Sequence, residues 1–182
     1  LDCCLLSDAG GAFIVTSAER ARDLPAKPVW LLGGGESHTH EHLLSAESLT
    51  HFGALHSGRM AYDMAGLGPQ DMDVAMLYDC FTITVIVELE DLGFCPKGEG
   101  GRFVSGGNIA PGGKYAVNTS GGGLSYNHPG MYGLLVLIEA IRQVRGECDK
   151  RQVKNCDIAL AHGNGGVLSS QCTVIFGSEN TL

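Results

Sequence analysis

The sequence predicts an α/β fold in which helices pack against a mixed β-sheet. Short apolar runs, typical of buried strands, alternate with segments whose apolar residues recur at helical spacing. The last two apolar runs are separated by a glycine-rich turn, which predicts a closing hairpin and therefore strands of both directions. With 182 residues and 44% hydrophobic side chains, the chain can bury one core, so we expect one domain over residues 1–182.

Each element follows from a local pattern. Apolar runs bounded by turn-forming residues predict strands over residues 11–16, 28–33, 74–78, 156–161 and 172–176. Helical spacing predicts helices over residues 17–23, 55–66, 79–92 and 130–145. Asp79 or Thr82 would cap the third helix. A tight turn over residues 163–166 joins the last two strands.

Residues 94–123 stand apart from these elements. The chain has 27 glycines, and many of them fall in this stretch, which shows little periodicity. A loop of this length inside a compact domain is usually functional or packs as an extension of the fold. We therefore expect a glycine-rich loop region here, within the single domain.

Charge and composition exclude several classes of partner. The net charge is −8, from 12 basic and 20 acidic residues, which argues against a nucleic-acid partner. No apolar run approaches the roughly 20 residues that span a bilayer, so we expect no membrane insertion. The sequence shows neither a signal segment nor a peroxisomal address, and we expect a cytoplasmic protein.

The cysteines and histidines do not predict a metal site. The seven cysteines are an odd number without paired C-x-x-C spacing, which favours buried free thiols over disulfides or zinc ligands. His38, His40 and His42 alternate along the chain, but they fall in a polar stretch, so we interpret them as a surface run.

The stretch from residue 118 to residue 130 is the first candidate site. A glycine-rich loop brings backbone amides close to a ligand, which makes Asn118 and Gly122 candidate substrate-binding positions. His128 and Pro129 then precede a long predicted helix, whose positive end favours a neutral imidazole that donates a hydrogen bond. The alternative for His128 is a purely structural histidine.

Two strand ends supply further candidates. Tyr78 and Cys80 lie at a strand-to-helix junction, where ligands of α/β sheets commonly bind, and each side chain could transfer protons. A core tyrosine and a buried cysteine are the alternative. His162 begins the turn between the last two strands and is a candidate substrate contact, or else a histidine satisfied within a hairpin.

Several motifs occur in the order seen in the thiolase superfamily. They are Tyr78-Asp79-Cys80-Phe81, Gly98-Glu99-Gly100-Gly101, Asn118-Thr119-Ser120-Gly121-Gly122, His128-Pro129, Gln143-Val144-Arg145-Gly146-Glu147 and Arg151-Gln152-Val153. The chain resembles most the branch with sterol carrier protein thiolases and lipid-transfer protein thiolase-like aldolases. The resemblance extends from Ser7 to Ile175 and implies the C-terminal half of a fold built from two similar halves, each a mixed sheet layered with helices.

The resemblance also implies partners. The nucleophilic cysteine of the family belongs to the N-terminal half, so this chain corresponds to a fragment or one piece of a split enzyme and is expected to be inactive alone. An isolated half would expose apolar surface that normally faces its other half. The implied partners are the N-terminal half, a second copy in a homodimer of the full enzyme, and a small zinc-ribbon and OB-fold protein.

The chain departs from the family pattern at three places. Ordinary thiolases have Asn-Glu-Ala-Phe, and sterol carrier thiolases His-Asp-Cys-Phe, where this chain has Tyr78-Asp79-Cys80-Phe81. Cys80 thus matches a family acid/base cysteine, whereas Tyr78 replaces a histidine. The C-terminal Cys-x-Gly motif is matched by a stretch without cysteine that begins at His162, and Tyr126 replaces a lysine. Tyrosine at both places resembles the aldolase branch, which cleaves β-hydroxyacyl-CoA.

The resemblance implies a mechanism with a CoA thioester as substrate and no further cofactor. Thiolysis and retro-aldol cleavage both generate a thioester enolate, whose oxygen needs hydrogen-bond donors. His128 is assigned to that oxygen, Tyr78 to the same oxygen or a proton, and Tyr126 to the general base or to enolate reprotonation. Cys80 is the acid/base if the enzyme is a thiolase. A retro-aldolase for a sterol-like or aromatic acyl group is favoured, with a β-ketoacyl-CoA thiolase or a non-catalytic module as alternatives.

Overall fold

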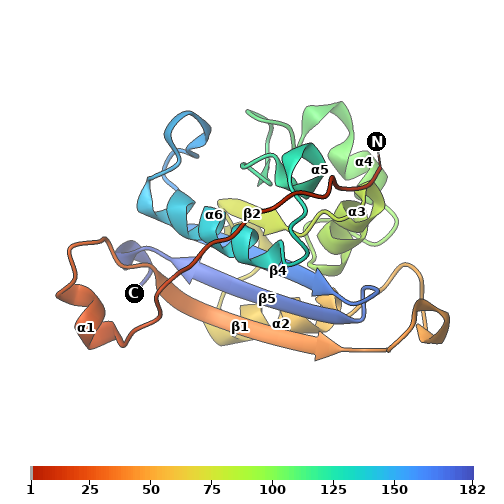
Figure 1. Ribbon diagram of the computed structural model, residues 1–182, viewed down its shortest axis with the longest axis horizontal. Coiled ribbons are helices and arrows are strands. Elements are labelled where there is room, and N and C mark those ends of the chain that lie inside the picture. The colour runs from red at the N-terminus through yellow and green to blue at the C-terminus, as the bar shows by residue number, and fades with distance from the viewer. Residues whose placement is uncertain (1) are drawn as a thin grey trace.

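A five-stranded mixed sheet forms the centre of the protein. The computed structural model describes residues 2–182, without the side chain of Tyr126. Within that range the strands are β1 (Trp30–His38), β2 (Val74–Leu77), β3 (Ala116–Val117), β4 (Ile158–Gly165) and β5 (Ser170–Gly177). Their order is β1-β5-β4-β2-β3 (Figure 1). β2 pairs in parallel with β3 and β4, whereas β5 runs antiparallel to β4 and β1, as the predicted hairpin requires.

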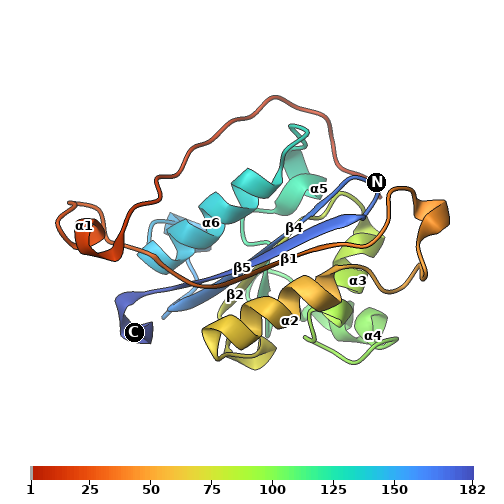
Figure 2. The ribbon, with the colours of Figure 1, turned by 90° about the horizontal axis from the view of Figure 1, so that it is seen from below.

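Helices cover both faces of this sheet. They are α1 (Ala18–Arg22), α2 (Ala54–Ala65), α3 (Thr82–Asp91), α4 (Gly100–Val104), α5 (Gly122–Tyr126) and α6 (Gly133–Arg145). Short 3₁₀ turns span Leu43–Ser45, Pro69–Asp71, Ser105–Gly107, Asp149–Arg151 and Glu179–Thr181. α6 and α5 lie on one face, and α2, α3 and α4 lie on the other, which confirms the predicted α/β architecture (Figure 2).

The strand alternation divides the core into two layers. On one face, Tyr132 at the N-cap of α6 and Val136 and Ala140 within α6 are buried against Met76 and Ala161 of the sheet. On the opposite face, α2 and α3 pack on the intervening strand residues, which include Ala75, Leu77, Leu160 and Ile175. Successive strand side chains point to opposite faces, so the apolar strand β2 and the apolar first half of β4 are buried on both sides.

Strand β1 continues beyond the glycines that were expected to stop it. The predicted strand ended at Gly33, but β1 runs on to His38. A Cβ at Gly33 would collide with the carbonyl oxygen of Ala61, and one at Gly35 with that of Ser57, both in α2. The glycines therefore do not end the strand. They allow the backbone of α2 to approach the strand more closely than a side chain would permit.

The predicted strand over residues 11–16 is wrong. This segment is irregular, and Phe13, Ile14 and Val15 are exposed. It passes over the outer side of α6, where Gly11 lies against Leu134 and Ile138 (Figure 2). A strand needs a neighbouring strand edge for its backbone hydrogen bonds. The path over α6 offers no such edge among the described residues.

Other boundaries shift for local reasons. Residues 94–123 contain α4 and β3 in addition to loops, because part of the stretch reaches β2 and pairs with it. α6 begins at Gly133, not at Gly130, whose φ of 81° is left-handed. β4 extends through Gly165, so the hairpin turn spans residues 166–169 and begins at the last residue of the predicted turn.

The described cysteines and helices bear on two further expectations. All seven cysteines are free, but only Cys95, Cys148 and Cys156 are buried, whereas Cys3 and Cys172 are exposed. In the range 2–182, no helix has the length and apolar character needed to cross a bilayer.

Candidate active site

The candidate site lies where strands β2 and β4 end at their carboxyl termini. The backbone N–H of Tyr78 donates to the carbonyl oxygen of His162 at 3.0 Å, which extends the pairing of the two strands past Leu77. Asn118 anchors the glycine-rich loop to the same edge, because its Oδ1 accepts a hydrogen bond from the N–H of Leu77 at 2.6 Å. The side-chain carbonyl of Asn118, a predicted substrate-binding residue, is thus engaged with the backbone of β2.

Tyr78 and His128 are brought together across this edge. The Tyr78 hydroxyl lies 3.3 Å from His128 Nδ1, and the two rings meet edge to face with centroids 6.1 Å apart. Burial raises the pKa of Tyr78, so the phenol keeps its proton and can donate a hydrogen bond to Nδ1. In the tautomer that accepts this hydrogen bond at Nδ1, the imidazole has its proton on Nε2, where it can donate to a ligand.

The loop that carries His128 is held by the N-terminal segment. The Ser7 hydroxyl donates to Asn127 Oδ1 at 2.9 Å, and the Ser7 N–H donates to the His128 carbonyl at 3.4 Å. Asn127 is buried, whereas Ser7 is exposed. These two contacts fix the backbone on both sides of the position from which the imidazole projects.

Asp79 is a site residue that the sequence reasoning considered only as a helix cap. Its buried carboxylate accepts from the N–H groups of Gly123 at 2.7 Å and Leu124 at 3.2 Å. Burial raises its pKa, and these N–H donors oppose the rise. Gly122 has a φ of 72°, and a Cβ there would collide with Asp79 Oδ2. The predicted substrate position Gly122 is therefore packed against a carboxylate, and glycine is required by that close approach.

Cys80 lies beside a polar cluster that reaches into the core. Its Sγ is 3.6 Å from Asn164 Oδ1 and 3.8 Å from Thr84 Oγ1. Burial raises the pKa of Cys80, so the thiol is favoured over the thiolate. Asn164 also donates from Nδ2 to the Tyr78 carbonyl at 2.9 Å and to Glu88 Oε1 at 2.6 Å. Asn164 thereby joins Cys80 to the buried side chain of Glu88.

His162 is buried in the core. Its Nδ1 lies 2.8 Å from Thr173 Oγ1 and its Nε2 lies 2.7 Å from Gln171 Oε1. Desolvation lowers the pKa of His162 to about 4, so the ring is neutral at physiological pH. With no exposed surface and both nitrogens engaged, His162 has no ring nitrogen available to a substrate. The β4 side chain that does reach the site is that of Asn164, which contacts Cys80.

Two further points concern what the sequence predicted. Tyr126 is the last residue of α5, but its side chain lies outside the described part of the structure, so its role stays a prediction.

Glu88 was not predicted from the sequence as a site residue. Its signal was the spacing of Thr84, Glu88 and Asp91 within an otherwise apolar helix, which places three polar groups on one face.

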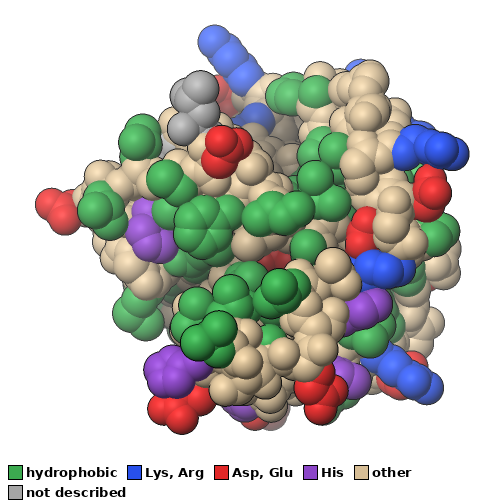
Figure 3. All heavy atoms as spheres, turned by 90° about the vertical axis from the view of Figure 1, so that its right-hand side faces the viewer, with side chains coloured by type: hydrophobic (Ala, Val, Ile, Leu, Met, Phe, Trp, Pro, Cys, Tyr) green, Lys and Arg blue, Asp and Glu red, His purple; other side chains and the backbone are tan. Residues whose placement is uncertain are grey.

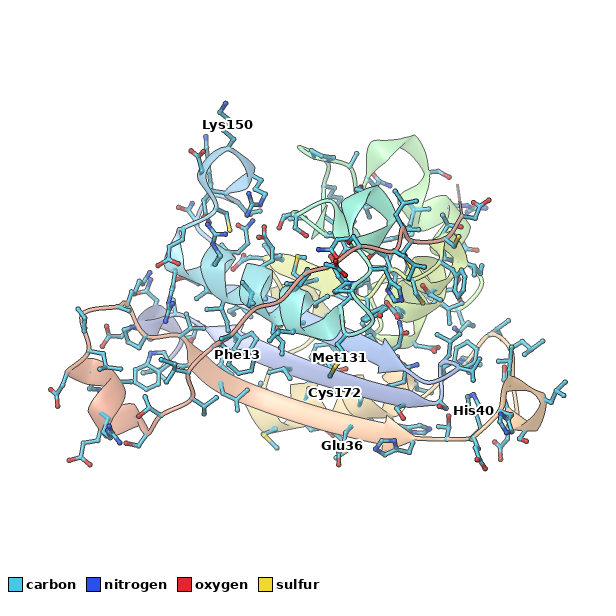
Figure 4. The ribbon with its side chains drawn as sticks, in the orientation of Figure 1. Phe13, Glu36, His40, Met131, Lys150 and Cys172 are labelled. Atoms are coloured by element: carbon cyan, nitrogen blue, oxygen red, sulfur yellow. The ribbon has the colours of Figure 1, made fainter. Side chains whose placement is uncertain are left out.

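The surface around the site is apolar. Figure 3 shows hydrophobic side chains gathered on the face that carries the N-terminal segment and the β1–α2 loop. Exposed members from these and adjoining elements are Leu5, Leu6, Leu44, Leu49, Phe81, Ile83 and Met131. Figure 4 shows Phe13 and Met131 on the same side of the sheet as α6. So large an exposed apolar surface is typical of an interaction face.

Comparisons with known proteins agree with this fold. A family model described as thiolase C-terminal domain-like matches residues 35–178. The acetyl-CoA acetyltransferase of Methanothermobacter thermautotrophicus is 36% identical over 97% of this chain and 46% of its own length. The steroid side-chain-cleaving aldolase of Thermomonospora curvata is 37% identical over 91% of this chain and 43% of its own length.

A solved structure gives the same result. The Ltp2-ChsH2(DUF35) aldolase has a TM-score of 0.87 and 35% identity, over 100% of this chain and 47% of that chain. This chain therefore spans about half the length of the proteins it matches. Because the family model matches most of its residues and the whole chain superposes on this aldolase, the chain belongs to the thiolase superfamily, in which it corresponds to the C-terminal half.

Proposed function

We propose that this chain is the C-terminal half of a retro-aldolase that cleaves a β-hydroxyacyl-CoA. The observation that carries the proposal is the Tyr78–His128 pair, in which the Tyr78 hydroxyl meets Nδ1 and leaves the Nε2 proton of His128 for a ligand. Tyrosine at this position is the feature that resembles the aldolase branch. The similarity to proteins named as aldolases, one of them steroid side-chain-cleaving, supports the same activity and a sterol-like acyl group.

The proposed reaction needs one base and one oxyanion donor. The base removes the proton of the β-hydroxyl, the bond between the α- and β-carbons breaks, and its electron pair moves into a thioester enolate. The β-carbon leaves as a ketone or aldehyde, and a proton added to the α-carbon completes the shortened acyl-CoA. His128 Nε2–H donates to the enolate oxygen. Tyr126 serves as base or reprotonates the enolate, and Tyr78 orients His128 or takes over one of these protons.

A β-ketoacyl-CoA thiolase is the second candidate. Two observations favour it: the Cys80 thiol donates a hydrogen bond to Asn164 Oδ1 at 3.6 Å, and the chain is similar to an acetyl-CoA acetyltransferase. In that reaction Cys80 would give and take the proton at the α-carbon or the CoA sulfur. Its raised pKa suits the acid form. In either reaction the CoA thioester is the substrate, and the residues proposed here act without a further cofactor.

The proposed assembly follows from the length of the chain and its exposed apolar side chains. The matched relatives are about twice as long, and we assign the missing N-terminal half to the apolar face that includes Leu6, Phe81 and Met131. A homodimer of the full enzyme is the expected state. The two-protein name of the similar aldolase supports a small partner protein, for which a zinc-ribbon and OB-fold protein is expected. A cytoplasmic location is part of the same proposal.

Tyrosine variants in the complete enzyme with its partner test this function. Tyr78→Phe and Tyr126→Phe each remove one oxygen and keep the ring. At least one should lose about 10²–10⁴-fold of aldol cleavage while still binding substrate, as expected for loss of an acid/base group. Cys80→Ala should cost much less. Tyr62→Phe is the matched control, because the Tyr62 hydroxyl donates to the Leu92 carbonyl at 3.1 Å away from the site.

The assay compares a β-hydroxyacyl-CoA with a β-ketoacyl-CoA plus free CoA. Consumption of the β-hydroxy substrate, lost in a tyrosine variant and kept in Tyr62→Phe, is the expected result. If only the β-keto substrate is consumed, and only Cys80→Ala is inactive, the thiolase assignment replaces the aldolase.

A further inference from the structure

A pocket opens beside the candidate site, on the side of the sheet that carries α2 and α3. Its volume is about 240 Å³, and it lies between one face of α3, the β1–α2 loop and the β4–β5 turn. The apolar lining residues are Leu43, Leu49, Phe52, Ala54, Ile83, Val87 and Leu168. The polar ones are Thr84, Glu88, Asp91 and Gln171.

Three of the four polar side chains are fully engaged with protein groups. Asp91 accepts from the Phe52 N–H at 2.8 Å and contacts Lys97 Nζ at 2.7 Å. Thr84 donates to the Phe81 carbonyl at 2.7 Å. Gln171 meets His162 through Oε1 at 2.7 Å and donates from Nε2 to the Leu168 carbonyl at 3.0 Å.

Glu88 is the exception. Its side chain is 4% exposed, and Oε1 accepts from Asn164 Nδ2 at 2.6 Å. Oε2 is buried and has no hydrogen-bond partner among the described residues. Burial raises the pKa of Glu88 well above its ordinary value, which favours the neutral acid. Because Oε1 already accepts a hydrogen bond, the acid proton belongs on Oε2, where it is an unused donor. A buried polar group without a partner is unfavourable, and a ligand oxygen would satisfy it.

The pocket shares a wall with the proposed reacting centre. Thr84 lines the pocket and also lies 3.8 Å from Cys80 Sγ. Glu88 reaches Cys80 through a single intervening side chain, Asn164. The pocket is therefore close enough to Cys80 to receive part of a substrate whose thioester is bound there.

We propose that the pocket holds the acyl group of the CoA thioester, an apolar group that bears one uncharged oxygen, and that the Glu88 carboxylic acid donates a hydrogen bond to this oxygen. The assignment rests on the proposed function and names its substrate class. A carboxylate on the acyl group would not suit the pocket, since no Lys or Arg lines it and the apolar walls disfavour charge. A purely hydrocarbon group would leave the Glu88 donor unsatisfied.

The test uses two acyl-CoA ligands and the complete enzyme with its partner. They are 3-cyclohexylpropanoyl-CoA and 3-(4-oxocyclohexyl)propanoyl-CoA, which differ by one ketone oxygen and carry no β-oxygen to be cleaved. Calorimetry should show that the wild type binds the ketone ligand roughly three- to tenfold more tightly, the ratio expected of one hydrogen bond. Glu88→Gln keeps a donor and should keep the preference, and Glu88→Leu should lose it. Glu99→Leu, at an exposed glutamate before α4, is the matched control and should behave as wild type.

A second variant tests the pocket without touching Glu88. Val87→Phe places a ring in the 240 Å³ space and should weaken both ligands by roughly tenfold. Equal affinities for the two ligands in the wild type, a preference that survives Glu88→Leu, or no effect of Val87→Phe would each overturn the proposal. The last result is the one expected if the N-terminal half fills the pocket. Cleavage of a β-hydroxyacyl-CoA and its loss in the tyrosine variants are measured separately, so the proposed function can stand when this assignment falls.

Discussion

Two histidines of this chain, His128 and His162, follow the same local pattern and lie in opposite environments. Each adjoins a glycine-rich turn near the carboxyl end of the sheet. His128 is half-buried and meets one phenol through Nδ1, whereas His162 is fully buried and both its nitrogens meet protein side chains. The difference arises from the neighbouring strand. Thr173 and Gln171 of β5 enclose His162, whereas within residues 2–182 His128 forms an isolated β-bridge with Leu6 and is not part of a strand.

The comparison shows that hydrogen-bond partners distinguish a structural histidine from a functional candidate better than sequence position does. An imidazole whose two nitrogens both hydrogen-bond to protein groups stabilises the fold in its neutral form and has no nitrogen left to bind a ligand. A ring with one nitrogen engaged has a fixed tautomer and one free position. Variants at the two sites should therefore separate activity from stability.

The largest expected effect is on catalysis at His128. His128→Ala in the complete enzyme should lower kcat by about 10²–10³, the usual loss for one oxyanion donor, with little change in the free energy of unfolding. His162→Ala should instead lower stability and leave the activity of the folded fraction. Turnover and denaturant unfolding of both variants give the four values needed. Near-normal turnover in folded His128→Ala would show that His128, like His162, has no catalytic role.

The next effect is acid sensitivity from His162. Its pKa is lowered to about 4 in the folded state, so the unfolded chain binds the proton more tightly below the ordinary value of about 6.5. The stabilisation from the neutral ring is present above about pH 6.5 and is lost as pH falls toward about 4, by about 3 kcal/mol in all. Urea unfolding at about pH 7 and about pH 4 measures it against His162→Gln. Because Glu88 titrates with the opposite sign, both chains should carry Glu88→Gln. If the chains with His162 and with His162→Gln lose the same unfolding free energy between about pH 7 and about pH 4, the acid sensitivity arises from other groups.

A smaller effect separates two left-handed glycines of the candidate loop. Gly122 and Gly130 have φ values of 72° and 81°, but a Cβ collides with Asp79 only at Gly122. Gly130→Ala should cost about 1 kcal/mol of unfolding free energy from the backbone alone. Gly122→Ala should cost at least about 2 kcal/mol, since it also displaces the carboxylate from its N–H donors. Thermal unfolding compares the two variants, and equal costs would mean that the Asp79 contact does not constrain the loop.

The smallest effect concerns the support of His128 by Ser7. Ser7→Ala removes the 2.9 Å hydrogen bond to Asn127 and should cost about 1 kcal/mol of unfolding free energy. Because the imidazole is then less well fixed, kcat should fall by roughly fivefold. Ser17→Ala removes the α1 cap, an exposed bond of 3.4 Å, and should leave kcat unchanged. Identical kinetics in the two variants would show that Ser7 does not position His128.

Much of the fold could be predicted because its signals are local. Helix α2 ends at Gly66 in the left-handed conformation, and β2 is apolar throughout, so both were readable from their own residues. The segment over residues 11–16 has the composition of a strand but no strand edge beside it, and an edge is a property of the whole fold. The glycines of β1 were misinterpreted for the same reason. They are needed because the backbone of α2 packs closely against the strand, and that contact is also a property of the whole fold.

The site was predictable only in part. Tyr78 and His128 were identified from motifs, and the structure brings them within 3.3 Å of each other. The burial of His162 could not be foreseen, since Thr173 and Gln171 are supplied by β5 across the hairpin. Glu88 was hidden because a charged residue on a helix is ordinarily solvated, and only its spacing with Thr84 and Asp91 indicated otherwise.

The close contact between β1 and α2 has a consequence for substrate range. Gly33 and Gly35 set how near α2 lies to the sheet, and the start of α2 carries Ala54, with Phe52 just before it, into the pocket wall. A methyl group at either glycine would collide with the backbone of α2 and push the helix away from the sheet. Because the start of α2 forms part of the pocket wall, this shift would widen the pocket. A substitution at Gly33 or Gly35, neither of which lines the pocket, could thus change the size of the acyl group that the proposed pocket accepts.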